Sequence, residues 1–273
     1  MVDSINSSSA AGVRGLGQSM QGLNGTQGRI STGLRVSSPK QDAALFAIAT
    51  QISGDLAGNA AVRSSFNQAE ATVGTALAAG QVVNNLLTDM KAKAIQANDP
   101  SLDDASRQAV DQEFQQLAGQ LNTVVSSASF SGTNLIESGA EDMSVLTNAD
   151  GGTLTVGAQD LSSGGLGLDG VSLGTPADAA NALSAIDGAI NTASAGVAQL
   201  GSSAQSIENQ AEFATSLDNV LREGLGNIVD ANLGQESAAL AAEKVKTELG
   251  LRSLAIANAG PQAMRSLFPG GSS

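Results

Sequence analysis

The chain has 273 residues and a formal net charge of −13, and it contains no His, Cys, Trp or Tyr. Without His and Cys it lacks the commonest general base, every thiol nucleophile and the usual ligands of zinc. Ser-His-Asp and Cys-His catalytic arrangements are excluded, and the sequence shows no carboxylate cluster that could replace them. We therefore predict a protein that is not an enzyme and that binds no metal and no cofactor.

The acidic residues are concentrated in the middle of the chain. Residues 41–233 hold 22 acidic against five basic side chains, whereas residues 1–40 hold one against four and residues 234–273 hold three against four. Because an acidic surface repels nucleic acid and anionic membranes, neither is an expected partner. The sequence has no apolar stretch of 18 residues and no features of a cleaved secretion signal, so we expect no membrane insertion.

The N-terminal region predicts a helix over roughly 10–33 and then a connector that contains Gly33 and Pro39. Six glycines lie in this helix ahead of Gly33, and each costs about 0.5–1 kcal/mol of helix stability relative to Ala. We expect the helix to become ordered only when it packs against another helix. Its apolar side chains recur at intervals of three, four or seven residues: Val13, Leu16, Met20, Leu23, Ile30 and Leu34.

Three helices are predicted in the middle of the chain, over about 42–97, 102–128 and 177–224. Their apolar residues recur every three or four positions, which is typical of helices packed in a bundle. Gly80 falls on this stripe and is expected to weaken it. Gly224 and Gly226 are expected to end the third helix and begin a second connector. The predicted bundle core is Phe66, Val73, Val83, Leu87, Met90, Leu183, Ile186, Ile190, Val197, Leu200 and Ile207.

Residues 129–175 are rich in Gly, Ser, Thr and Asp, and they predict a small β region between the second and third of these helices. Apolar and polar residues alternate from Met143 to Thr147 and again over 153–156. The dipeptide Asp150-Gly151 lies between the two runs and is a common turn of β-hairpins. We therefore predict one hairpin in this region.

The C-terminal region predicts a helix over 235–267 with its own apolar stripe. Val245, Leu249 and Ile256 follow the same rhythm of threes and fours, with Arg252 in the remaining position. A helix with one apolar stripe must pack against another helix to leave water. The two ends of the chain are thus predicted to pair with each other or with the ends of other copies. The predicted subunit-packing residues are Val13, Leu16, Met20, Leu23, Ile30, Leu34, Arg35, Val245, Leu249 and Ile256.

The predicted fold is mainly α: an elongated helical bundle with terminal coiled-coil helices and a small β-hairpin region. Five segments follow from the pattern. Residues 1–40 form the N-terminal helix and connector, 41–128 the N-terminal arm of the bundle and 129–175 the β region. Residues 176–233 form the C-terminal arm and 234–273 the C-terminal helix.

Four stretches of the sequence resemble bacterial flagellin, and the resemblance covers essentially the whole chain. The first runs from Arg29 to Ala44, RISTGLRVSSPKQDAA, and matches the most recognisable N-terminal signature of the family. The second is Phe130–Ile136, and the third is Asn227–Asn232, at the start of the C-terminal signature. The fourth, Leu254–Asn258, resembles the closing helix.

This resemblance implies a structural subunit that polymerises into the flagellar filament and gives motility. It implies that the terminal helices form an inner coiled-coil domain lining the filament channel, and that outer domains are absent. The implied partners are other flagellin copies, the flagellar export apparatus, an export chaperone, and hook-associated and cap proteins. The implied location is outside the cell, in the filament. Two alternatives remain open: a hook–filament junction protein, and a helical adaptor that does not polymerise.

Overall fold

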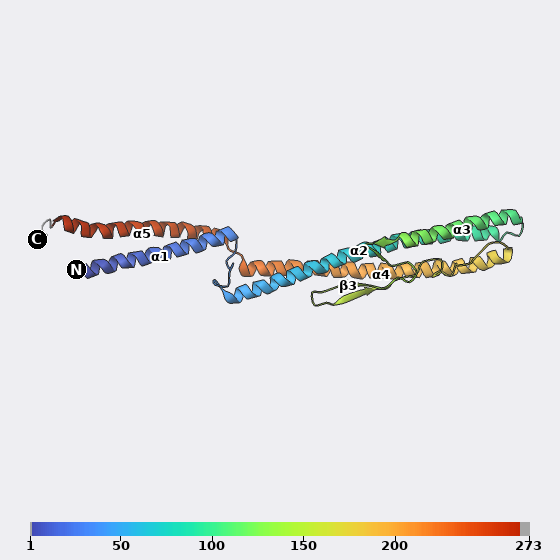
Figure 1. Ribbon diagram of the computed structural model, residues 1–273, viewed down its shortest axis with the longest axis horizontal. Coiled ribbons are helices and arrows are strands. Elements are labelled where there is room, and N and C mark those ends of the chain that lie inside the picture. Colours follow the sequence, from blue (N-terminus) through green and yellow to red (C-terminus); the bar gives the residue numbers. More distant parts are fainter. Residues whose placement is uncertain (1, 268–273) are drawn as a thin grey trace. The chain divides into compact units, whose positions relative to one another are not determined.

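The computed structural model describes the backbone of residues 2–267 and the side chains of residues 10–257 and of Ala259. Within this range the chain forms five helices and two small antiparallel sheets of two strands each (Figure 1). This confirms the predicted fold class, a mainly helical chain with a small β-hairpin region. The helices are α1 (Val2–Thr32), α2 (Ala43–Ala97), α3 (Asp104–Ser127), α4 (Pro176–Val229) and α5 (Leu233–Leu267).

The chain divides into two compact units. The terminal unit comprises residues 1–54 and 221–273, and the bundle unit comprises residues 55–220. The chain passes from one unit to the other within α2 and again within α4. The charge follows the same division, since the bundle unit holds 19 acidic and four basic side chains and the terminal unit holds seven and nine.

Two helix boundaries differ from the sequence-based prediction. The helix predicted to end at Gly224 continues to Val229, so the second connector is only Asp230–Asn232. The prediction was wrong because a glycine inside a helix costs only about 1 kcal/mol, which packing can offset. Gly224 and Gly226 are both partly buried. The first helix begins at Val2, ahead of the predicted residue 10.

The core of the bundle unit is an apolar stripe on each of its helices, closed by the β region. On α2 the buried positions recur every three or four residues from Val62 to Ala97, as the amphipathic pattern requires. Loop residues Leu135, Ile136, Leu161 and Leu173 are also fully buried in this core. The eleven predicted core residues all lie in it; Leu183, Ile190 and Val197 are partly buried and the other eight are buried.

Polar side chains fix the turn between α2 and α3. The Asp103 carboxylate caps α3, accepting hydrogen bonds from the backbone N–H and the hydroxyl of Ser106, and these bonds lower the pKa of Asp103. Arg107 is 2% exposed, and its guanidinium donates to the carbonyl oxygens of Ala97, Asp99 and Leu102. This buried cation thus satisfies the last carbonyl of α2, at Ala97, and ties it to two carbonyls of the turn.

The β region contains the predicted hairpin and a second one that the sequence analysis missed. Strands β3 (Met143–Leu146) and β4 (Thr153–Val156) pair antiparallel across the turn that contains Asp150 and Gly151. Strands β1 (Ser129–Phe130) and β2 (Thr133–Asn134) form a tighter hairpin. Its two turn residues, Ser131 and Gly132, have φ angles of 52° and 84°, as a type I′ turn requires.

Gly80 allows α2 and α4 to approach each other closely, rather than merely weakening the apolar stripe. A Cβ atom added at Gly80 would lie 2.6 Å from Cγ2 of Val197 on α4, a distance that real Cβ atoms essentially never show. Gly74, two turns earlier on α2, is exposed and has no atom within 4 Å of the same position. Substitution of the two glycines therefore compares a closely packed and an open position in the same helix.

We expect Gly80→Ala to lower the free energy of unfolding of the bundle by about 1–3 kcal/mol, because the added methyl group forces the helices apart. Gly74→Ala should raise it by about 0.5–1 kcal/mol, since it only improves helix propensity. Urea unfolding of both full-length variants, followed by far-ultraviolet circular dichroism, measures the difference. Equal midpoints for the two variants would contradict the close approach at Gly80.

Candidate functional site

The terminal helices α1 and α5 pack side by side and antiparallel (Figure 1). Three close approaches define the register: Gly12 faces Leu254, Leu16 faces Gly250, and Gly22 faces Glu243. As the residue number rises by ten along α1, the number of the facing residue falls by eleven along α5. The chain therefore pairs its own ends, which was one of the two possibilities that the sequence left open.

Small residues on α1 set the distance between the two helices. A Cβ atom added at Gly12 would lie 3.2 Å from Cδ2 of Leu254, and one added at Gly22 would lie 3.2 Å from Cδ of Glu243. Gly15, Gly17 and Gly28 differ, because nothing lies within 4 Å of their added Cβ atoms. These α1 glycines thus divide into two that face α5 and three that face open space; Gly25 differs from both, because its added Cβ would meet only Arg29 of α1.

An ion pair joins the two helices near the connectors. Arg29 Nε lies 2.8 Å from Glu236 Oε1, and Arg29 Nη2 donates to the hydroxyl of Thr26, which is 3% exposed. The second oxygen of Glu236 is buried and has no hydrogen-bond partner among the described residues. A partly buried ion pair between two helices costs desolvation but favours one register.

The two connectors are joined by backbone hydrogen bonds. Leu34 and Asp230 form an antiparallel bridge, and Ala231 N donates to Gly33 O at 2.9 Å. Arg35 contributes twice: its backbone N donates to Val229 O and its Nη2 donates to Ile228 O, both at 2.6 Å. Because these carbonyls lie at the C-terminus of α4, Arg35 acts as a cap. The end of α1 and the start of α5 are thereby held together.

Helix α5 has two opposite faces, each with a strict heptad spacing. One series is partly buried: Glu236, Leu240, Glu243, Thr247, Gly250, Leu254 and Ala257. The other series is exposed at every position: Ala238, Ala242, Val245, Leu249, Arg252, Ile256 and Ala259. The two series are offset by two residues, which corresponds to a rotation of about 200° around an α-helix. We call them the inner face and the outer face of α5.

The stripe predicted for the C-terminal helix is the outer face, which points away from α1. Val245, Leu249 and Ile256 are 55%, 59% and 75% exposed. The inner face escaped the sequence analysis because only two of its seven residues, Leu240 and Leu254, have large apolar side chains. The signal that could have found it is the second heptad series, offset by two residues from the first.

The predicted packing residues of the N-terminal segment divide between two environments. Leu16, Leu23, Ile30 and Leu34 are partly buried. Val13 and Met20 are 59% and 52% exposed, and with Gly17 between them they define the outer face of α1. Arg35 is exposed, with its side chain bonded to its own chain. Contacts of any of these residues with another copy remain a prediction.

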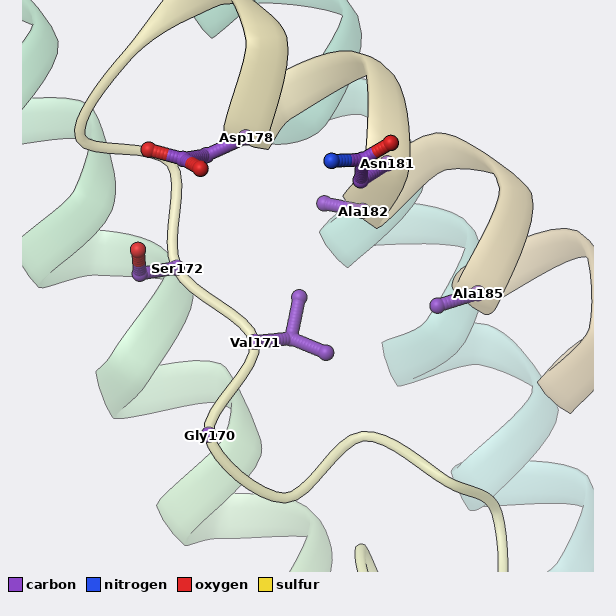
Figure 2. Close-up of a pocket in the computed structure, with 7 residues that line it drawn as sticks. All are labelled: Gly170, Val171, Ser172, Asp178, Asn181, Ala182 and Ala185. Carbon is purple, nitrogen blue, oxygen red and sulfur yellow. The ribbon is translucent and has the colours of Figure 1, made fainter.

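We also searched the described residues for metal sites, membrane-spanning helices and cavities. No group of three or more acidic side chains could hold a metal ion, and no helix is long and apolar enough to cross a membrane, among the residues described. A cavity beside the N-terminus of α4 is lined by Val171, Ser172, Asp178 and Asn181 (Figure 2). The carboxylate of Asp178 accepts a hydrogen bond from the Thr175 hydroxyl, so it belongs to the capping of α4.

Comparison with known proteins matches both halves of the chain. Residues 4–140 match the bacterial flagellin N-terminal helical region, and residues 183–268 match the bacterial flagellin C-terminal helical region. Flagellin FljO of Caulobacter vibrioides is 37% identical over 270 residues, covering 98% of this chain and 99% of the relative. A flagellin of Brucella melitensis is 31% identical over 279 residues, covering 97% and 98%.

A solved structure from Vibrio parahaemolyticus, described as a flagellar hook-associated protein, superposes with a TM-score of 0.59. It covers 70% of this chain and all of that one at 14% sequence identity, so it supports the fold alone.

The fold defines a class of helical protein in which the two terminal helices, α1 and α5, pair with each other. Both helices carry exposed apolar side chains on their outer faces. The chain belongs to the bacterial flagellin family. It is a structural protein that forms the filament of the flagellum, outside the cell, by association of many copies. The sequence-based recognition and the predicted function are confirmed at this level.

The ion pair between Arg29 and Glu236 can be tested by reversing its charges. We expect Arg29→Glu and Glu236→Arg each to weaken the pairing of α1 with α5 by about 1 kcal/mol, and the double variant to recover much of the loss. Amide hydrogen exchange of α1 in the monomer reports the pairing. Glu248→Gln is the control, because it breaks an exposed ion pair with Arg252 within α5. Faster exchange in the double variant than in either single variant would contradict the assigned register.

Proposed function

We propose that this flagellin assembles through the outer faces of α1 and α5, which pack against the terminal helices of neighbouring copies. The observation that carries the proposal is the exposure of the complete outer face of α5, opposite the face that packs on α1. Helices with one apolar face turned to water are unstable alone. Burying Val245, Leu249 and Ile256 against other copies would stabilise the polymer by about 1.5–3 kcal/mol for each fully buried side chain.

Two of the α1 glycines that face open space support the same surface. Gly17 and Gly28 lie on the helix side of Val13 and Met20, they lower helix stability, and within the chain no neighbouring atom requires their small size. Such positions let another helix approach the backbone closely. Copies can therefore approach α1 on the side where Val13 and Met20 are exposed.

The uneven distribution of charge favours contacts between copies through one of the two units. The bundle unit carries 15 more acidic than basic side chains, and the terminal unit carries two more basic than acidic ones. Acidic surfaces of neighbouring copies repel each other, while the nearly neutral terminal units can meet without that penalty. We infer that the terminal units form the tightest contacts and that salt, by screening the bundle units, favours assembly.

The family resemblance extends the proposal to partners. Terminal helices that are marginal alone suit export in a partly unfolded form, followed by ordering at the growing end of the filament. An export apparatus, an export chaperone, hook-associated proteins and a cap protein are the partners proposed on this basis. The chain acts by assembly rather than by catalysis. Full-length similarity to flagellins favours a filament subunit over a junction protein or a non-polymerising adaptor.

Seeded polymerisation tests the proposed surface. Purified full-length protein with short filament seeds and a precipitating salt should form long uniform tubes, visible by negative-stain electron microscopy. Leu249→Gln should keep the helical content of the monomer but raise the critical concentration for assembly about tenfold, because a polar side chain replaces one buried between copies. Leu251→Gln is the matched control, since Leu251 is 55% exposed on α5 but lies off the outer face.

Tubes from Leu249→Gln at the wild-type concentration would contradict the outer face as a contact. A folded wild-type monomer that forms no tubes would favour the junction-protein or adaptor alternatives. Removing residues 235–273 should abolish assembly and leave the bundle unit folded.

The open glycines of α1 allow a test with opposite effects on monomer and polymer. We expect Gly17→Ala to stabilise α1 in the monomer by about 0.5–1 kcal/mol and yet to raise the critical concentration, because its methyl group occupies space used by a neighbouring copy. Gly25→Ala is the control: its added Cβ would meet only Arg29 of the same helix, at 3.7 Å. Amide exchange measures the first effect and sedimentation the second. Equal assembly of the two variants would exclude close contact at Gly17.

A further inference from the structure

Methionine is the side chain of this protein most open to mild oxidation. The sequence has five Met and none of the other readily oxidised residues, Cys, His, Trp and Tyr. Oxidation of Met adds one oxygen to the thioether and changes a flexible apolar side chain into a polar one. The consequence of oxidation therefore depends on where each thioether lies.

The described methionines differ sharply in exposure. Met90 is fully buried in the bundle core, and Met143 on β3 is partly buried against the same core. Met20 is 52% exposed on α1. The side chains of Met1 and Met264 lie outside the described residues. Among the methionines whose side chains are described, Met20 is thus the one that an oxidant in solution reaches most easily.

Met20 also lies on the outer face of α1. Val13, Gly17 and Met20 follow each other at intervals of four and three residues, and no atom lies within 4 Å of a Cβ added at Gly17. The missing side chain at Gly17 leaves one side of Met20 open to a small oxidant and to another helix. An oxidant cannot reach Met20 when another helix covers it.

We propose that Met20 is an oxidation site that controls assembly of this flagellin. The proposal rests on the proposed function, in which the outer face of α1 is buried between copies. The oxidant is a small hydroperoxide such as hydrogen peroxide. The Met20 sulfur attacks one peroxide oxygen, the O–O bond breaks, and the sulfur takes up that oxygen. For hydrogen peroxide the other oxygen leaves as hydroxide and takes the proton of the transferred oxygen to become water, so the sulfur loses two electrons and the peroxide gains them.

The sulfoxide opposes assembly because its oxygen is a strong hydrogen-bond acceptor. On the N-terminal side of Met20 the outer face offers no side-chain donor, since Val13 and Gly17 are the residues there; Asn24, one turn further on, is exposed and carries an amide that can donate. Burying an unsatisfied polar group against another helix is unfavourable, and every copy in the polymer meets the same penalty. In the polymer the thioether is covered, so assembly in turn protects Met20 from oxidation.

The first experiment measures where oxygen is added. Wild-type monomer and seeded filaments are treated with the same dilute hydrogen peroxide, quenched, digested with trypsin and analysed by mass spectrometry. Cleavage after Lys and Arg places the five methionines in five different peptides, with Met20 in residues 15–29 and Met90 in residues 64–91. In the monomer Met20 should oxidise at least about tenfold faster than Met90, and in filaments its rate should fall by a similar factor. Equal Met20 rates in monomer and filament would overturn the proposal.

The second experiment measures the effect on assembly. Peroxide treatment of the monomer should raise the critical concentration about ten- to a hundredfold. Met20→Leu keeps an apolar side chain that peroxide does not oxidise, so it should assemble equally well before and after treatment. Met264→Leu retains Met20 and should remain sensitive. A mixture of the two epimer-specific methionine sulfoxide reductases should restore assembly of the treated wild type.

Loss of assembly in treated Met20→Leu would overturn the proposal, because the damage would then lie elsewhere. Untreated wild type that fails to assemble on seeds would instead contradict the proposed function. The monomer oxidation rates are read independently of assembly, so the two failures are distinguishable.

Discussion

The antiparallel pairing of α1 with α5 is the contact on which the organisation of the terminal unit depends. It relies on small and polar residues: glycines of α1 admit Leu254 and Glu243, and the ion pair between Arg29 and Glu236 fixes the register. A seam of this composition buries little apolar surface and is correspondingly weak. Apolar side chains of both helices stay exposed outside this seam, among them Met20 on α1 and Leu249 and Ile256 on α5.

Holding the two connectors together compensates for part of that weakness. Arg35 caps the carbonyls of Ile228 and Val229, and the bridge between Leu34 and Asp230 joins the two chain segments. Helices that leave such a junction side by side need little further energy to stay paired, because most of the entropy of bringing them together is already lost. The signature that runs from Arg29 to Ala44 contains Leu34 and Arg35, and the stretch Asn227–Asn232 contains their partners, which gives both stretches a structural reason within the single chain.

Sequence periodicity predicted the bundle well and the terminal unit incompletely. In α2 and α4 the large apolar residues that recur every three or four positions, such as Phe66 and Ile186, are buried within the chain itself, so their spacing located the core. The end of α4 was predicted too early because Gly224 and Gly226, which are partly buried, remain within the helix. The β1–β2 hairpin was missed because its strands have two residues each, too few for an alternating pattern.

Along the predicted stripe of α5 the usual relation between apolarity and burial is reversed. The residues that stand out in the sequence, Val245, Leu249 and Ile256, are exposed in the single chain, whereas Gly250 and Glu243 face α1. A periodicity argument identifies surfaces that must leave water, but it does not say whether the same chain or another copy covers them. Under the proposed function, the strongest apolar stripe of α5 is the one that other copies bury. The weaker seam is the one that pairs the two ends of a single chain.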